Sequence, residues 1–151
     1  RRLSRQRPQW FRPGQAVSVF FDTNVLVYCT DATAPQKQAI ARALVAEAST
    51  AGDAVLSTQV LIELFNVLTR KQRMPPAQAK ALTLAYANLT VVHSDVTLVT
   101  AAMEKSIQFQ LSIWDAMVIE AATRSGAHTI YTEDLTHGQR FDALTVVNPF
   151  L

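Results

Sequence analysis

The sequence predicts an α/β fold, a three-layer α/β/α sandwich with a mainly parallel central sheet. Short segments rich in β-branched and aromatic residues alternate along the chain with longer segments of helical character. Alternation of this kind is typical of a parallel sheet between two helical layers. A length of 151 residues favours one domain with a core of its own, and we place that domain at residues 17–151.

The predicted strands are short, β-branched and bounded by turn residues. They cover residues 17–21, 54–57, 90–93, 128–132 and 144–148. The predicted helices begin at capping residues or at prolines and end at glycines or polar turns. After a brief helix behind Asp22, they cover residues 35–51, 58–72, 77–89, 95–110 and 112–126.

The bulk composition excludes several classes of protein. A hydrophobic content of 49% with 17% charged residues is typical of a globular chain and not of a disordered one. The apolar runs are too short for a transmembrane helix, and we identify no secretory signal. The single cysteine, Cys29, cannot form an internal disulfide and fits a reducing compartment. We therefore expect a cytoplasmic protein without a membrane partner.

Residues 1–16 differ from the rest of the chain in charge. They contain five arginines and no acid, whereas the remaining residues carry nine Lys and Arg against twelve Asp and Glu. The segment lacks a helix or strand period, and Pro8, Pro13 and Gly14 interrupt it. It is therefore predicted to be a basic, disordered tail, which is either an arm for RNA phosphates or an extension without function.

Four acids from distant parts of the sequence fall where an α/β sheet binds ligands. Asp22 follows the first predicted strand, and Asp134 follows the strand at 128–132. Glu63 lies in the helix after the second strand, and Asp115 lies in the first turn of a late helix. Ligands of open α/β sheets bind outside the carboxyl ends of the strands, so one sheet edge can receive all four.

Each of these acids also has a purely structural interpretation. Asp22 can cap the next helix, and Asp134 can be an ordinary turn acid. Asp115 stands at capping-box spacing from Ser112. Glu63 is surrounded by apolar residues, so it either lies on one exposed stripe or is buried with a partner.

Taken together, four segments resemble the acidic segments of the PIN-domain nucleases, most closely VapC-type toxins of bacterial toxin–antitoxin pairs. They are FFDTNVLVY, STQVLIELFNVLTRK, SIWDAMVIEAA and IYTEDLTHG, in that order. The resemblance runs from about Val17 to Leu151, and the basic tail departs from it. It implies the three-layer PIN-like fold, with Asp22, Glu63, Asp115 and Asp134 as the catalytic and metal-binding acids. It also implies a homodimer and a cognate antitoxin protein as partner.

Carboxylates that lie together at one edge of the sheet repel one another and need a positive charge nearby. At about 4 Å and an effective dielectric of about 20, each like-charged pair costs on the order of 4 kcal/mol. Oxygen ligands without a Cys or His cluster suit Mg²⁺, or Mn²⁺, and not zinc. Such a cation supplies a nucleophilic water and binds a phosphate oxygen. We therefore expect Mg²⁺-dependent hydrolysis of RNA phosphodiester bonds, with Glu63 or Asp115 orienting or deprotonating the attacking water.

Further residues are candidates for supporting roles. The resemblance suggests that Thr23, Asn24 and Thr132 hydrogen-bond the acids, although all three are also ordinary turn and cap residues. An acidic site that binds a polyanion needs positive charge at its rim. Candidates for RNA contact are Arg70, Lys71 and Arg73, which alternatively complement the dipole of their own helix.

The expected function is that of an endoribonuclease toxin which inhibits translation. One alternative is a PIN-domain nuclease for RNA processing that has no antitoxin. A second is a non-catalytic module that binds RNA or protein, which would require the loss of an acid, and none is missing. A third is a phosphoryl-acceptor domain, which normally needs a lysine after a late strand, but no lysine occurs after Lys105.

Overall fold

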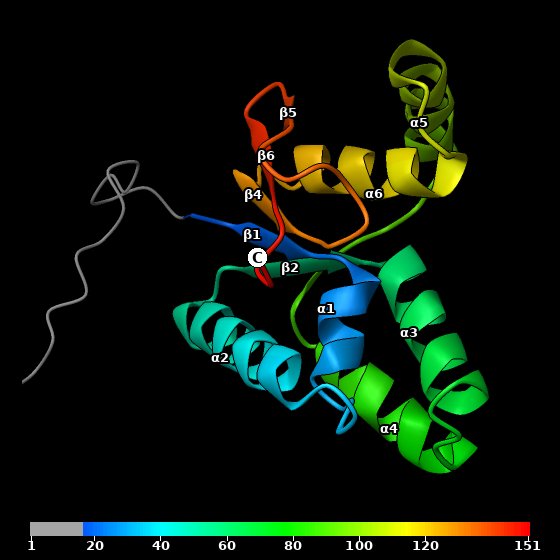
Figure 1. Ribbon diagram of the computed structural model, residues 1–151. Coiled ribbons are helices and arrows are strands. Elements are labelled where there is room, and N and C mark those ends of the chain that lie inside the picture. The colour runs from blue at the N-terminus through cyan, green and yellow to red at the C-terminus, as the bar shows by residue number, and fades with distance from the viewer. Residues whose placement is uncertain (1–16) are drawn as a thin grey trace, which may run out of the picture.

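The computed structural model describes residues 17–151, which form a three-layer α/β/α sandwich (Figure 1). The predicted basic tail, residues 1–16, lies outside the described residues. The strands are β1 (Val19–Phe21), β2 (Ala54–Ser57), β3 (Thr90–Val92), β4 (Thr129–Tyr131), β5 (Arg140–Phe141) and β6 (Leu144–Val147). The helices are α1 (Thr23–Tyr28), α2 (Pro35–Ala51), α3 (Thr58–Arg70), α4 (Pro76–Tyr86), α5 (Val96–Phe109) and α6 (Ile113–Arg124).

The six strands form one sheet in the order β3-β2-β1-β4-β6-β5. Every neighbouring pair is parallel except β5 with β6, which is antiparallel. Strand β1 is central, and its Phe20 stands opposite Val55 of β2 and Ile130 of β4. The predicted α/β fold with a mainly parallel sheet is thus confirmed.

Helices cover both faces of this sheet. In Figure 1, α5 and α6 lie over one face, and α1, α2, α3 and α4 lie over the other. No helix within residues 17–151 is long and apolar enough to cross a membrane.

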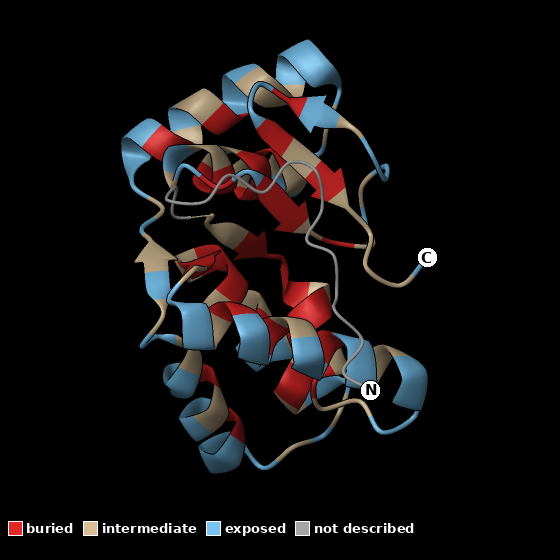
Figure 2. Ribbon diagram, turned by 90° about the vertical axis from the view of Figure 1, so that its left-hand side faces the viewer, coloured by how far each residue is buried: buried red, intermediate tan, exposed pale blue. Residues whose placement is uncertain are grey.

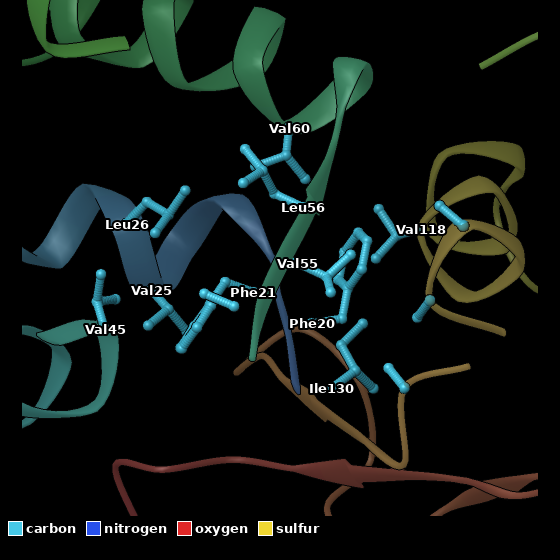
Figure 3. Close-up of a cluster of buried hydrophobic side chains, with 14 of the residues drawn as sticks. Phe20, Phe21, Val25, Leu26, Val45, Val55, Leu56, Val60, Val118 and Ile130 are labelled. Carbon is cyan, nitrogen blue, oxygen red and sulfur yellow. The ribbon is translucent and has the colours of Figure 1, made fainter. Parts of the chain in front are cut away.

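The core lies on both sides of β1 because successive strand residues point to opposite faces. Phe20 lies near Val118 of α6, whereas Phe21 lies near Val25 of α1 (Figure 3). Both phenylalanines are almost fully buried. Burial concentrates in the sheet and on the inner sides of the helices, as Figure 2 shows. Each fully buried aromatic or aliphatic side chain of this size stabilises the fold by roughly 1.5–3 kcal/mol.

The helix boundaries follow the capping signals in the sequence. Ser57 accepts a hydrogen bond from the Val60 amide, and Asp95 accepts one from the Leu98 amide, so these residues cap α3 and α5. Gly52 ends α2 with a left-handed φ of 75°, which glycine adopts without steric cost.

The hairpin of β5 and β6 was not predicted. Its two-residue strand β5 is too short to show a strand period, and Phe141 pairs with Leu144 across a tight turn. Asp142 in that turn has a φ of 52°, a conformation that Asp tolerates better than most residues. The hairpin places β5 at one end of the sheet, away from β1.

Candidate functional site

Three of the four predicted acids come from elements around the carboxyl end of the central strand. Asp22 directly follows β1, and Asp134 follows β4, the parallel neighbour of β1. Glu63 lies on α3, which begins directly after β2, the other neighbour of β1. The parallel register therefore brings residues 41 to 112 positions apart to one edge of the sheet.

Asp22 is a buried carboxyl, and its side chain is only 6% exposed. Its Oδ1 accepts a hydrogen bond from the Thr23 amide at 2.7 Å, so it does cap α1. Its Oδ2 accepts a second bond from the Thr132 hydroxyl at 2.8 Å. Asp22 can therefore cap α1 and take part in the candidate site at the same time.

Burial raises the pKa of Asp22 to about 7, although the hydrogen bonds from Thr132 and Thr23 act in the opposite direction. The negative charges of Asp134 and Glu63 raise it further. A carboxyl with this pKa carries a proton or needs a cation to balance its charge at neutral pH.

Asn24 connects the two strand-end acids. Its Nδ2 donates to Asp134 Oδ2 at 2.9 Å and to the Thr132 hydroxyl at 3.1 Å. Its Oδ1 accepts a bond from the Glu133 amide at 3.3 Å. Thr132, which is fully buried, also accepts from the Asp134 amide. These bonds fix the turn after β4 relative to the start of α1.

Glu63 is half-buried and both of its carboxylate oxygens accept hydrogen bonds. Thr23 Oγ1 donates to Oε2 at 2.9 Å, and Gln59 Nε2 donates to Oε1 at 2.9 Å. Glu63 therefore has hydrogen-bond partners without being fully buried, and so lies between its two interpretations. Gln59 was not among the predicted site residues, although its position four residues before Glu63 places the two on one face of the helix.

Among the described residues, Asp115 is the predicted acid that the side-chain hydrogen bonds of the site do not include. Ser112 caps α6 by accepting a bond from the Asp115 amide, but no side-chain hydrogen bond of the Asp115 carboxylate occurs within residues 17–151. The capping box expected between Ser112 and Asp115 is therefore incomplete, because only one of its two hydrogen bonds is present. Gln59 Nε2 also donates to the backbone carbonyl of Trp114, the residue before Asp115, at 3.2 Å.

A cavity of about 440 Å³ opens beside the acids. Glu63 and Asp134 line it, with Asn66 and Lys71 further along α3. Lys71 is the single basic residue among the described residues that line this cavity. Arg70 and Arg73 are exposed but do not line it.

A second polar cluster supports the turn that carries Asp134. Glu133 accepts bonds from the Tyr28 hydroxyl at 2.6 Å and from Lys37 Nζ at 2.8 Å. Burial raises the pKa of Glu133, but these two bonds and the positive charge of Lys37 together outweigh it, so the pKa lies below its ordinary value. The same contact with Glu133 raises the pKa of Lys37. Glu133 is thus neutralised by a lysine, unlike Asp22.

The donor set of the site fits a hard divalent cation by its chemistry. All candidate ligands are carboxylate oxygens, and the buried Asp22 carboxyl faces two further acids. Within residues 17–151, however, no group of three or more His, Cys, Asp or Glu side chains lies close enough together to hold a metal ion as placed.

The family model for the PIN domain matches residues 19–140, and the chain belongs to the PIN-domain family. This confirms the family resemblance inferred from the four acidic segments. Comparison with curated proteins finds no significant match.

Solved structures of toxins share the fold. VapC20 of Mycobacterium tuberculosis, a toxin that cleaves the sarcin-ricin loop, is 21% identical, with a TM-score of 0.60 over 75% of this chain and 87% of that one. A toxin–antitoxin complex from Klebsiella pneumoniae is 17% identical, with a TM-score of 0.62 over 87% and 98% of the two chains. A DNA-bound VapBC from Salmonella typhimurium is 15% identical, with a TM-score of 0.62 over 86% and 96%.

Proposed function

We propose that this protein is a metal-dependent endoribonuclease that hydrolyses RNA phosphodiester bonds. The observation that carries the proposal is the buried Asp22 carboxyl, whose pKa of about 7 reflects its burial and the nearby charges of Asp134 and Glu63. Membership of the PIN-domain family supports the same chemistry. A buried carboxyl close to two further acids is less favourable for the fold than a neutral cap would be, so capping alone does not explain Asp22.

Asp22, Asp115 and Asp134 would hold the cation, Mg²⁺ or Mn²⁺, with Glu63 completing the set. When bound, the cation supplies a nucleophilic water and charge neutralisation at the scissile phosphate. With a cation bound, Asp22 would be ionised, and the hydrogen bonds from the Thr132 hydroxyl and the Thr23 amide hold its carboxylate in place.

Glu63 is the best-placed group to orient the attacking water or take its proton. Thr23 and Gln59 fix its two oxygens, so the carboxylate cannot rotate freely. Asp115 is the alternative acceptor for this proton. Lys71 is the first candidate for a phosphate contact because it lines the cavity beside the acids, with Arg70 and Arg73 as exposed candidates nearby.

The cellular role we propose is that of a toxin which inhibits translation in the cytoplasm. The structural neighbours include toxin–antitoxin complexes whose matched chains align over nearly their whole length, which supports a cognate antitoxin. The homodimer remains part of the proposal on the family resemblance alone. The alternative is a PIN-domain nuclease for RNA processing without an antitoxin. A non-catalytic binding module is disfavoured because all four acids are present.

The experiment is incubation of total RNA with the purified protein in Mg²⁺, in Mn²⁺ and in EDTA. We expect cleavage in either metal and none in EDTA, with fragment ends that identify the target sequence. Cleavage that persists unchanged in EDTA would contradict metal dependence. Complete inactivity in both metals would shift the assignment to the binding module.

A further inference from the structure

The cavity beside the acids extends along one face of α3. The residues of α3 and its end that line it are Glu63, Asn66, Val67 and Lys71, which are spaced three or four positions apart. At a rise of about 1.5 Å per residue, the backbone of Lys71 lies about 12 Å beyond that of Glu63 along the helix. The cavity therefore reaches from an acid of the candidate site to the far end of α3.

The opposite wall of the cavity is α1, and hydrogen bonds join the two walls at both ends. Near the acids, Thr23 Oγ1 donates to Glu63 Oε2 at 2.9 Å. At the far end, Thr30 Oγ1 donates to Gln72 Oε1 at 2.8 Å, and Gln72 Nε2 donates to the Val27 carbonyl at 3.3 Å. The chain itself thus holds the two walls at a fixed spacing.

The middle of the cavity offers apolar surface and a polar amide. Val27 on α1 and Val67 on α3 both line it and are partly exposed. Asn66 also lines it and is exposed, and no hydrogen bond of its side-chain amide occurs within residues 17–151. That amide can both donate and accept hydrogen bonds. Flat apolar rings with polar edges, such as nucleobases, match a lining of this kind.

The charge of the lining argues against a phosphate in the middle of the cavity. Lys71 is the single basic residue among the described residues that line it, whereas four acids do so: Asp31, Glu63, Glu133 and Asp134. A phosphate placed among these carboxylates would be repelled. An uncharged base would not be, and its amino groups can donate hydrogen bonds to carboxylate oxygens.

Asp31 is an acid of this lining that keeps an oxygen without a protein donor. Its Oδ1 accepts bonds from the Thr33 amide at 3.0 Å and from the Thr33 hydroxyl at 2.6 Å. No hydrogen bond to its Oδ2 occurs within residues 17–151. A carboxylate oxygen accepts a bond from the amino group of cytosine but not from the carbonyl oxygen that uracil has in its place.

We propose that the cavity between α1 and α3 binds one unpaired RNA base beside the scissile phosphate and prefers a base with an amino group, such as cytosine, to uracil. The base packs against Val27 and Val67, and its edge bonds with Asn66 and Asp31. The inference rests on the proposed function and names the part of the substrate that the site distinguishes. The cavity volume of about 440 Å³ is that of a small-molecule site, and the edge of a base is free for such bonds only in unpaired RNA.

The test measures the binding of short RNA to the protein by fluorescence anisotropy. The probes are labelled oligo-C and oligo-U of six nucleotides, and the protein carries Asp22→Asn so that the RNA stays intact in Mg²⁺, as a gel would verify. We expect this parent protein to bind oligo-C roughly 5- to 100-fold more tightly than oligo-U, which corresponds to one set of specific base contacts.

Two substitutions in the parent protein test the residues that the inference names. Asn66→Leu keeps the approximate size of the side chain and removes its amide, so it should weaken oligo-C binding and leave oligo-U binding nearly unchanged. Asp31→Asn keeps an oxygen for Thr33 and replaces the other oxygen with a donor, so it should reduce or reverse the preference for oligo-C. Circular dichroism would show that both variants are folded.

The matched control is Gln78→Leu in the same parent protein. Gln78 is an exposed amide on α4, and it does not line the cavity. Its replacement makes nearly the same chemical change as Asn66→Leu at a different surface. We expect Gln78→Leu to bind both probes as the parent protein does.

Equal affinity of the folded parent protein for the two probes would overturn the inference. A preference that survives in both Asn66→Leu and Asp31→Asn, or that is lost equally in Gln78→Leu, would overturn it as well, since the preference would then not arise in this cavity. Cleavage of RNA by the wild type without any preference in binding would contradict the inference alone. A preference for oligo-C without cleavage by the wild type would instead contradict the proposed nuclease and leave an RNA-binding cavity.

Discussion

Thr132 Oγ1 lies 2.8 Å from Asp22 Oδ2, although the two residues are 110 positions apart in the sequence. One follows β4 and the other follows β1, and these strands are parallel neighbours. The same hydroxyl accepts bonds from Asn24 and from the Asp134 amide. A single buried hydroxyl thus ties together the elements that carry two of the proposed metal-binding acids.

Removal of this hydroxyl in Thr132→Val should weaken both the fold and the site. Several hydrogen-bonding groups lose a partner at once, which costs on the order of 1–3 kcal/mol in the free energy of unfolding. We expect Mg²⁺ affinity to fall by roughly 10- to 100-fold, measured by calorimetry. Thr129→Val, at the start of β4, is the control, since no side-chain hydrogen bond of Thr129 occurs within residues 17–151. Equal effects of the two variants would contradict the role given to Thr132.

The pKa of Asp22 predicts how the stability of the metal-free protein depends on pH. The folded-state pKa of about 7 lies above the ordinary value of 3.8, so the folded protein binds the proton more tightly than the unfolded chain. The resulting stabilisation is complete below the ordinary value and is lost as the pH rises through about 7. From pH about 4 to about 8, we expect the wild type to lose on the order of 4 kcal/mol relative to Asp22→Asn.

Chemical denaturation in EDTA at several pH values measures this difference. Asparagine at position 22 does not titrate. The contributions of the other titratable groups to the pH dependence of stability therefore cancel when the two proteins are compared. A stability difference between the two proteins that does not change with pH would contradict the raised pKa. Added Mg²⁺ should restore stability to the wild type at high pH and leave Asp22→Asn unaffected.

Glu133 adjoins Asp134 but should contribute little to catalysis. Its carboxylate is neutralised by Lys37, and what it gives to the site is a backbone bond to Asn24. Glu133→Gln keeps that bond, and because the Lys37 side chain is 40% exposed to solvent, which screens the ion pair, we expect only a small loss of stability. RNA cleavage rates should stay within about threefold of wild type, whereas Asp134→Asn should lose most activity. Similar losses in both variants would refute this separation of roles.

Lys71 should contribute more to RNA binding than its neighbour Arg70. Only Lys71 of this pair lines the cavity beside the acids. Loss of one phosphate contact should weaken RNA binding and lower the slope of log affinity against log salt by about 1. Fluorescence anisotropy with a catalytically inactive background would compare Lys71→Ala with Arg70→Ala. A larger loss of RNA affinity in Arg70→Ala would contradict this expectation and assign the phosphate contact to the exposed side of α3.

The sequence predicted the fold well because its signals are local. Ser57, Asp95 and Gly52 mark helix ends by capping chemistry that depends on a few neighbouring residues. The two-residue strand β5 was not predicted, because it is too short to show a strand pattern of hydrophobic residues. Its pairing depends instead on the turn and on β6. Local signals therefore located the elements around the site, but not the pairing at the edge of the sheet.

The site was predictable only in part. The acids stand at strand ends and in an apolar helix, which can be recognised without a structure. Gln59 was missed because a lone glutamine in a helix usually faces solvent, and its contact with Trp114 depends on how α3 and α6 pack. How near Asp115 lies to the other acids likewise depends on that packing and not on its own segment.

The most direct test of the central claim is RNA cleavage by wild type and by Asp22→Asn, side by side at pH about 8 in Mg²⁺. Circular dichroism and thermal melting would establish that both proteins are folded. The account predicts cleavage by the wild type and none by the folded variant, because the variant lacks the carboxylate that holds the cation. Undiminished cleavage by Asp22→Asn would contradict the account, since the buried carboxyl would then have no part in the chemistry.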